Sequence, residues 1–69
     1  MKSIRNYAKQ VGHEVIGNLT RNPDKEYFMD SFDGSKKHCG SKFYMDEAGN
    51  EYWVSKTGVC IVDAHGAVI

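Results

Sequence analysis

Apolar and polar positions alternate through the carboxy-terminal part of the chain, where three four-residue segments interrupt the alternation. Each segment has Asp or Ser first and Gly fourth: Asp46-Glu47-Ala48-Gly49, Ser55-Lys56-Thr57-Gly58 and Asp63-Ala64-His65-Gly66. This composition is typical of a type I turn followed by a glycine at positive φ, a common three-residue hairpin connection. The segments between the turns are rich in β-branched and aromatic residues. They predict a four-strand antiparallel meander over residues 42–45, 51–54, 59–62 and 67–69.

Three-residue loops also predict how the strands pair, and therefore which residues share a face. They put Phe43 opposite Trp53, Trp53 opposite Ile61, and Ile61 opposite Ile69. Alternation then gives one face with Phe43, Met45, Trp53, Val59, Ile61 and Ile69, interrupted by Glu51, and another with Tyr44, Tyr52, Val54, Cys60, Val62 and Val68. Because both faces are apolar, each requires a cover from the N-terminal segment, the middle of the chain or another molecule.

The N-terminal segment has a helical rather than an alternating pattern. Ile4, Tyr7, Ala8 and Val11 lie on one face of a helix, Ser3 is in position to cap it, and Gly12 is in position to end it. We predict a helix over residues 4–11 that packs on the sheet, because so short a helix is unstable alone. The predicted fold is α+β: one domain, residues 1–69, with this helix on an antiparallel sheet of four to six strands.

The middle of the chain has weaker signals. Residues 13–20 suit a strand, in which Gly17 indicates a bulge or a close backbone approach. Asn22-Pro23-Asp24 predicts a turn, and residues 26–30 a short extended piece. Residues 31–41 are polar and rich in turn formers, which predicts a mobile loop.

Composition and charge narrow the classes of function. The 69 residues have no net charge, but residues 1–42 hold eight Lys or Arg against five acids, and residues 43–69 hold one against four. No apolar run approaches the ~20 residues that span a bilayer, and no secretory signal is present, so we expect a cytoplasmic protein. Two cysteines in that setting predict no stable disulfide; Cys60 reads as a buried strand residue.

The candidate chemical groups do not form a known motif. The potential metal ligands His13, His38, Cys39, Cys60 and His65 lack the spacing of structural zinc sites. Cys39, beside His38 and two lysines, is the only candidate nucleophile, and nothing in the sequence brings a base to it. We therefore predict neither an enzyme nor a metalloprotein, and no cofactor.

Two kinds of binding remain, and protein recognition is the better supported. The predicted partner-binding residues are Phe43, Met45, Trp53 and Ile61 on the aromatic face, with Trp53 as the main anchor and Lys36, Lys37 and Lys42 as a cationic rim. The partner would be a host protein, a ribonucleoprotein or a second copy of the chain. Alternatively, Phe28, Met29 and Phe32 fold back over this face within the chain.

The other kind of binding is to nucleic acid or a nucleotide through residues 21–42. In this segment, cations are mixed with aromatic side chains on which bases could stack: Arg21, Lys25, Lys36, Lys37 and Lys42 with Tyr27, Phe28 and Phe32. The zero net charge weighs against a dedicated nucleic-acid binder.

The chain also resembles a known class of small proteins. It begins MKSIRNYAKQVGHEVIGNL and ends DEAGNEYWVSKTGVCIVDAHGAVI, and it combines this size with a hairpin-rich second half and no enzymatic motif. In these features it is similar to anti-CRISPR and other anti-defence proteins encoded by phages and mobile elements. The resemblance implies an inhibitor that binds and blocks a host effector without catalysis, or, as in some of these proteins, one that sequesters a nucleotide signal.

Overall fold

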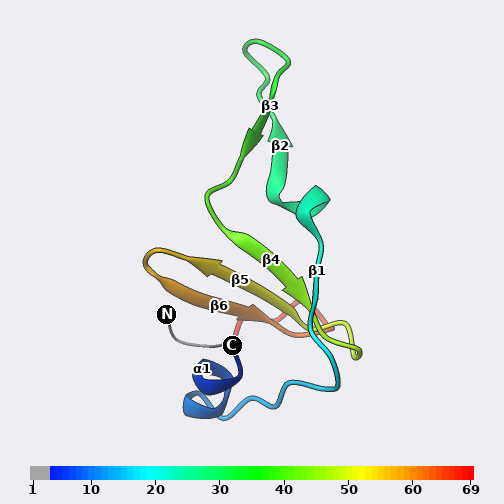
Figure 1. Ribbon diagram of the computed structural model, residues 1–69, viewed down its shortest axis with the longest axis vertical. Helices are drawn as coiled ribbons and strands as arrows, with labels where there is room; N and C mark the ends of the chain where they lie inside the picture. The colour runs from blue at the N-terminus through cyan, green and yellow to red at the C-terminus, as the bar shows by residue number, and fades with distance from the viewer. Residues whose placement is uncertain (1–3) are drawn as a thin grey trace.

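The computed structural model describes residues 4–69 and has the predicted α+β fold. Ser3, the predicted helix cap, lies outside the described residues. The elements in chain order are α1 (Ile4–Gln10), β1 (Thr20–Arg21), the 3₁₀ helix η1 (Pro23–Glu26), β2 (Tyr27–Met29), β3 (Lys36–His38), β4 (Lys42–Met45), β5 (Glu51–Ser55) and β6 (Gly58–Val62). Four strands form one antiparallel sheet in the order β1-β4-β5-β6, and β2 pairs with β3 in a separate hairpin (Figure 1).

Helix α1 covers one face of the four-stranded sheet. Its Ile4 and Ala8 are buried and form the core with Tyr52 of β5 and Ile61 of β6. Val11, the last residue of the predicted apolar stripe, is exposed and follows the end of the helix. The core therefore lies between α1 and the strands β5 and β6.

The C-terminal end of α1 has the glycine stop that the sequence predicts at Gly12. His13 N–H donates to the Ala8 carbonyl at 2.8 Å and Gly12 N–H to the Lys9 carbonyl at 3.3 Å, which is the Schellman pattern. Gly12 has the positive φ, 77°, that this pattern requires. The chain turns back at this point toward the sheet.

The first and third glycine turns also have the predicted geometry. Gly49 N–H donates to the Asp46 carbonyl at 3.2 Å, and Gly66 N–H donates to the Asp63 carbonyl at 2.9 Å. Phe43 pairs with Trp53 as predicted. The predicted strand over residues 67–69 is reduced to a single bridge between Val62 and Val68, in the register that the third turn predicts.

The second turn is one residue shorter than predicted, and this reverses the faces of β6. Ser55 pairs directly with Gly58, so the loop between them holds two residues. Trp53 therefore pairs with Cys60, and the predicted pairing of Trp53 with Ile61 is wrong by one residue. Because side chains alternate along a strand, Ile61 lies on the face that α1 covers, and Cys60 is exposed on the other.

Residues 13–19 do not form the predicted strand, because their backbone is held by the first glycine turn. The Asp46 carboxylate accepts the Ile16 N–H at 3.0 Å, and the Ile16 carbonyl accepts the Glu47 N–H at 3.0 Å. A Cβ on Gly17 would collide with the Glu47 carboxylate, so a side chain lies close to Gly17 and not the backbone that was predicted. Regular pairing with β4 begins only at Thr20.

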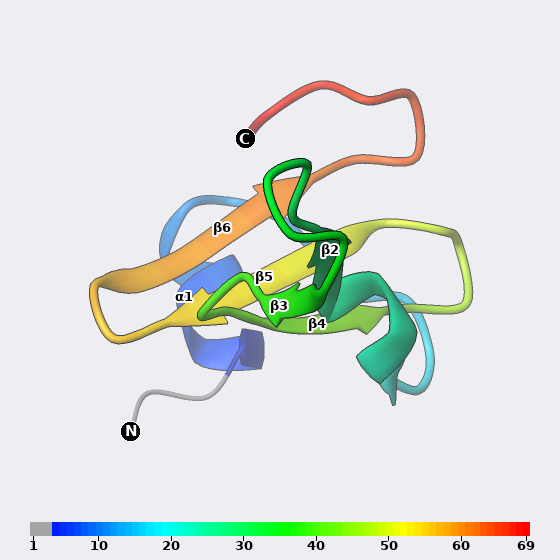
Figure 2. The ribbon, with the colours of Figure 1, turned by 90° about the horizontal axis from the view of Figure 1, so that it is seen from above.

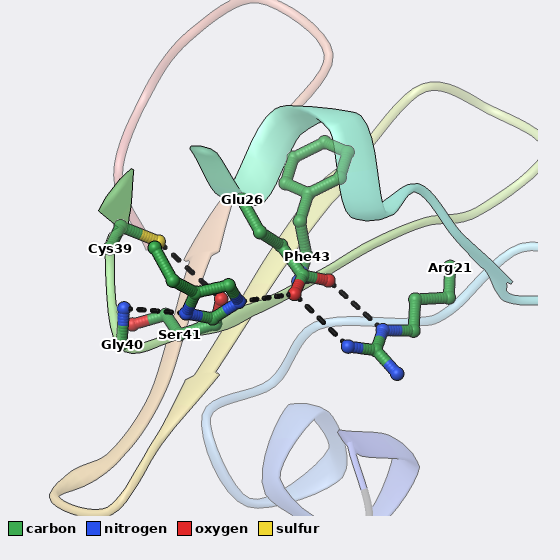
Figure 3. Close-up of polar contacts among 7 residues, drawn as sticks. Arg21, Glu26, Cys39, Gly40, Ser41 and Phe43 are labelled. Atoms are coloured by element: carbon green, nitrogen blue, oxygen red, sulfur yellow. Dashed lines mark hydrogen bonds and ion pairs between the residues drawn. The ribbon is translucent and has the colours of Figure 1, made fainter. Parts of the chain in front are cut away.

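The second face of the sheet is covered in part by η1, whose first turn is the predicted turn at Asn22-Pro23-Asp24: the Lys25 N–H donates to the Asn22 carbonyl at 3.2 Å. This helix packs on β4, and the Phe43 ring lies beneath it with only 1% of Phe43 exposed (Figure 3). The alternative that Phe28, Met29 and Phe32 fold back over this face is wrong, because all three are exposed.

Residues 27–38 form a hairpin that projects away from the sheet, and we call it the arm. It consists of β2, a tight loop and β3, so the predicted mobile loop over residues 31–41 contains a strand. The molecule measures 41 × 23 × 20 Å, and the arm extends along its longest dimension (Figure 1). In Figure 2, viewed along the arm, α1 lies behind β5 and β6 and the arm lies in front of them.

Candidate partner-binding surface

The arm presents its apolar side chains to solvent. Phe32 at the tip is 99% exposed, Met29 is 70% exposed, and Tyr27 and Phe28 are about half exposed. Tyr27 and Met29 alternate with Phe28 along β2, so the exposed apolar groups lie on both faces of the arm. A two-stranded hairpin that packs against nothing is marginally stable in water, so other interactions must hold this one.

Hydrogen bonds within the tip order the loop and leave Phe32 outside. The Asp30 carboxylate accepts the Phe32 N–H at 2.8 Å, and the Asp33 carboxylate accepts the Ser35 N–H at 2.9 Å. Lys37 forms ion pairs with both aspartates, at 3.2 and 3.8 Å. The polar side chains of the tip are thus used within the loop, and the Phe32 ring has no contact of this kind.

A buried glutamate anchors the arm at its base (Figure 3). Glu26, only 1% exposed, ends η1 immediately before β2. Its carboxylate accepts two hydrogen bonds from Arg21, each at 3.0 Å, and one from His38 Nε2 at 2.7 Å. The Arg21 guanidinium, with help from His38, lowers the pKa of Glu26 to about 2. An ionised carboxylate therefore joins β1, η1 and β3.

Glu26 also completes the hydrogen bonding of β4 where β1 ends. Strand β1 stops at Arg21, and the next residue, Asn22, donates its N–H to the Phe43 carbonyl at 3.1 Å. The Phe43 N–H then has no strand partner on that side, and the Glu26 carboxylate accepts it at 3.1 Å. A buried backbone donor at the edge of the sheet is thereby satisfied by a side chain.

The three lysines of the predicted cationic rim differ in their ion pairing. Lys37 is neutralised by its two aspartates, whereas Lys36 and Lys42 form no ion pair among the described residues. Lys36 is exposed on the arm and Lys42 is exposed at the start of β4. The three lysines therefore do not form one continuous charged edge.

The predicted aromatic face is only partly available. Phe43 and Ile61 are buried, while Trp53 and Met45 are half-buried. The Phe43 and Trp53 rings meet edge to face with their centroids 4.6 Å apart. The structure brings Phe43, Trp53 and Met45 onto one face and leaves Ile61 on the other. On this face, solvent reaches the exposed Cys60 and the half-buried Trp53 and Met45.

The geometry around Cys39 gives it no base. His38 Nε2 faces Glu26, and His38 Nδ1 accepts the Gly40 N–H at 3.0 Å, so both ring nitrogens are occupied. The Cys39 thiol donates instead to the Ser41 carbonyl at 3.4 Å. No group of three potential metal ligands converges anywhere within residues 4–69.

A second buried carboxylate organises the core beneath the sheet. Asp46 accepts hydrogen bonds from Asn50, Ile16 and Tyr52, and these outweigh its burial and hold the pKa of Asp46 below its usual value. Burial, and then the bond to Asp46, raises the pKa of Tyr52 far above its usual value. Because the Tyr52 hydroxyl donates to Asp46, it accepts from His13 Nε2 at 2.8 Å. All the partners are within the chain, so this cluster is structural.

The predicted extended piece over residues 26–30 contains β2, but its pairing with β3 and its anchor were not predicted. The available signal was the run Tyr27-Phe28-Met29, which does not alternate and so does not belong to a half-buried strand. Three consecutive large apolar residues in a polar stretch are compatible with an exposed binding segment. Nothing in the sequence pairs Glu26 with Arg21 or His38.

No protein family model, no curated protein and no solved structure matches this chain. Within residues 4–69, no helix has the length and apolar character needed to cross a membrane.

Proposed function

We propose that this protein is a small non-catalytic binding module that inhibits a host defence effector in the host cytosol, as anti-CRISPR proteins do. In this proposal the arm enters a concave surface of a partner protein or ribonucleoprotein, with Phe32 foremost. The observation that carries the proposal is the exposure of Phe32, 99%, at the tip of an ordered hairpin. An aromatic side chain gains most when it leaves water for an interface pocket.

The anchoring of the arm supports this role. Glu26 is bonded to Arg21, His38 and the Phe43 backbone, and its carbonyl accepts the Cys39 N–H at 2.8 Å. Both ends of the arm are thus tied to the sheet. Binding through a pre-ordered segment loses less conformational entropy than binding through a mobile loop.

The charges of the arm favour a protein partner over nucleic acid. The arm holds two lysines and two aspartates, so its net charge is zero. Lys37 is paired with both aspartates, and Arg21 at the base is paired with Glu26. Nucleic-acid binding depends mainly on unpaired cations that contact phosphates. Lys36 is the one lysine of the arm without an ion pair among the described residues, so the arm offers exposed aromatic side chains with little free positive charge, which fits a protein pocket better.

The Trp53 face supplies a second, smaller contact in this proposal. Trp53 and Cys60 are cross-strand neighbours, and Cys60 is exposed. This strip is available to the same partner or to a second copy of the chain. We assign it the weaker contribution, because Trp53 already packs against Phe43.

The test is affinity capture from lysate of the native host, with three baits. The baits are the wild type, Phe32→Ser, and Val68→Ser, which removes an apolar side chain that is 72% exposed and lies away from the arm. We expect wild type and Val68→Ser to retain one protein or complex after nuclease treatment, and Phe32→Ser to lose it. With the purified partner, Phe32→Ser should weaken Kd by roughly 30-fold, the equivalent of about 2 kcal/mol.

Two outcomes would contradict the proposal. Equal capture by all three baits would show that the arm tip is not the binding site. Loss of all captured protein on nuclease treatment, with equal capture by the three baits before treatment, would favour the nucleic-acid alternative instead.

A further inference from the structure

A small cleft at the base of the arm is lined by cations from separate parts of the chain. Its volume is about 320 Å³, and its lining residues are Arg21, His38, Gly40, Lys42, Val54, Ser55 and Lys56. Pockets for small molecules begin at roughly 300 Å³, so the cleft has room for a small ligand. No acidic side chain lines it.

The pairing of the strands explains why these cations converge. Lys42 and Val54 are direct partners across β4 and β5, and Arg21 is the partner of Tyr44, two residues further along β4. Side chains two residues apart on a strand point to the same face, so Arg21, Lys42 and Val54 share one face. Lys56 reaches the cleft from the turn between β5 and β6.

The cations in the cleft are only partly neutralised. Arg21 uses two of its five N–H groups on Glu26, and Lys42 and Lys56 form no ion pair among the described residues. Glu26 is 1% exposed and lies behind Arg21 and His38. Arg21 has Glu26 as its counter-charge, but Lys42 and Lys56 have none among the described residues, so an anion in the cleft would lower the electrostatic energy of these two lysines.

We propose that this cleft binds a phosphate group, either as inorganic phosphate or on a small phosphorylated molecule. A phosphate carries nearly two negative charges at neutral pH and offers several acceptor oxygens, which match the charges of two ammonium groups and the remaining N–H donors of Arg21. The guanidinium supplies the directed donors, and the lysines supply charge. Val54 and the lysine stems form an apolar wall for the rest of a phosphorylated molecule. The proposal uses residues other than the arm tip and does not depend on the inhibitor function.

The test is a titration followed by backbone amide NMR at constant ionic strength. The probes are inorganic phosphate, adenosine 5′-monophosphate and adenosine. We expect saturable shifts of the Gly40, Lys42, Ser55 and Lys56 amides with the first two probes only. Tighter binding of the monophosphate identifies a phosphorylated molecule as the better ligand, and equal binding identifies phosphate itself.

Two double variants make the test specific. Lys42→Gln with Lys56→Gln removes both lysines of the cleft, while Lys25→Gln with Lys36→Gln removes the same charge elsewhere. All four lysines are exposed, so both variants should keep the wild-type spectrum away from the changed sites. The first variant should weaken phosphate binding by at least about tenfold, and the second should leave it nearly unchanged.

Three results would overturn the proposal. The first is the absence of saturable shifts up to ~10 mM phosphate, because the Kd for phosphate would then be weaker than millimolar. The second is equal weakening in both double variants, which would mean general charge attraction. The third is binding of adenosine as tight as that of its monophosphate, which would mean that phosphate is not recognised.

Discussion

Two buried carboxylates, Glu26 and Asp46, decide where irregular segments attach to the sheet. Each accepts hydrogen bonds from backbone and side-chain donors. Glu26 receives them from His38 and Phe43, and Asp46 receives them from Ile16 and Tyr52. Glu26 holds the arm, and Asp46 holds the segment that leads from α1 to β1. A charged group in such a position is stable only while its donors remain, because its desolvation is costly.

The first prediction follows from the pKa of Glu26, which is lowered from 4.5 to about 2. Its ionised form is favoured by the fold, so its contribution to stability is complete above pH 4.5 and is lost as the pH falls toward 2. Glu26→Gln should therefore melt at a lower temperature than wild type above pH 4.5, and the gap should close near pH 2. Thermal unfolding followed by circular dichroism over this range measures the gap; a gap of constant size would refute the assignment.

The second prediction concerns the Tyr52 hydroxyl, which joins His13 to Asp46. Tyr52→Phe removes one hydrogen-bond partner from His13 and one from Asp46. It should therefore lower the free energy of unfolding by about 1.5–3 kcal/mol. Tyr44→Phe, on the same face and only half-buried, is the control and should change stability by less than ~0.5 kcal/mol. Urea unfolding compares the two; equal losses would mean that the bridge contributes nothing particular.

At the scale of elements, the glycine turns set the register of the meander. Gly49 has a φ of 88°, and a Cβ there would meet nothing closer than the Ala64 Cβ at 3.8 Å. Substitution is therefore disfavoured by the backbone conformation and not by a clash. The same φ, 88°, recurs at Gly66, which closes the third turn.

The third prediction tests this turn. Gly49→Val should cost at least ~1 kcal/mol, because a β-branched residue is forced to positive φ. Ala48→Val places the same side chain on the preceding, exposed residue of the turn, where φ is not positive, and should cost less than ~0.5 kcal/mol. Matching melting temperatures for the two variants would contradict the turn geometry.

The sequence predicted the elements whose signals are local. The helix stop at Gly12 and the first and third turns each depend on a glycine and its immediate neighbours, and all are present. The second turn differed because Ser55-Lys56-Thr57-Gly58 is compatible with a two-residue loop as well as a three-residue loop. That single-residue difference moved Ile61 from the predicted binding face to the core.

The arm could not be predicted in the same way, because it depends on contacts between distant residues. Glu26 is joined to His38, twelve positions later, and to Phe43, seventeen positions later. Residues 31–41 contain the strand β3, which pairs with β2 between this anchor and the hydrogen-bonded tip. The candidate site shifted accordingly, from the Trp53 face to the tip of the arm.

At the scale of the whole molecule, the helix and the sheet form a small base from which the arm projects (Figure 1). The base contains the buried side chains, and the arm contains the most exposed aromatic one, Phe32. This division means that binding and stability can be changed separately. Phe32→Ser should leave the free energy of unfolding within about 0.5 kcal/mol of wild type, because the ring is already in water.

The central claim, that the arm tip inhibits a defence effector, is tested most directly by phage infection. Bacteria whose defence systems restrict an infecting phage would express wild type, Phe32→Ser or the control Val68→Ser at equal levels. We predict that wild type and Val68→Ser restore plaque formation and that Phe32→Ser does not. Restoration by Phe32→Ser to the wild-type level, or no restoration by wild type against any of the defence systems, would contradict the account.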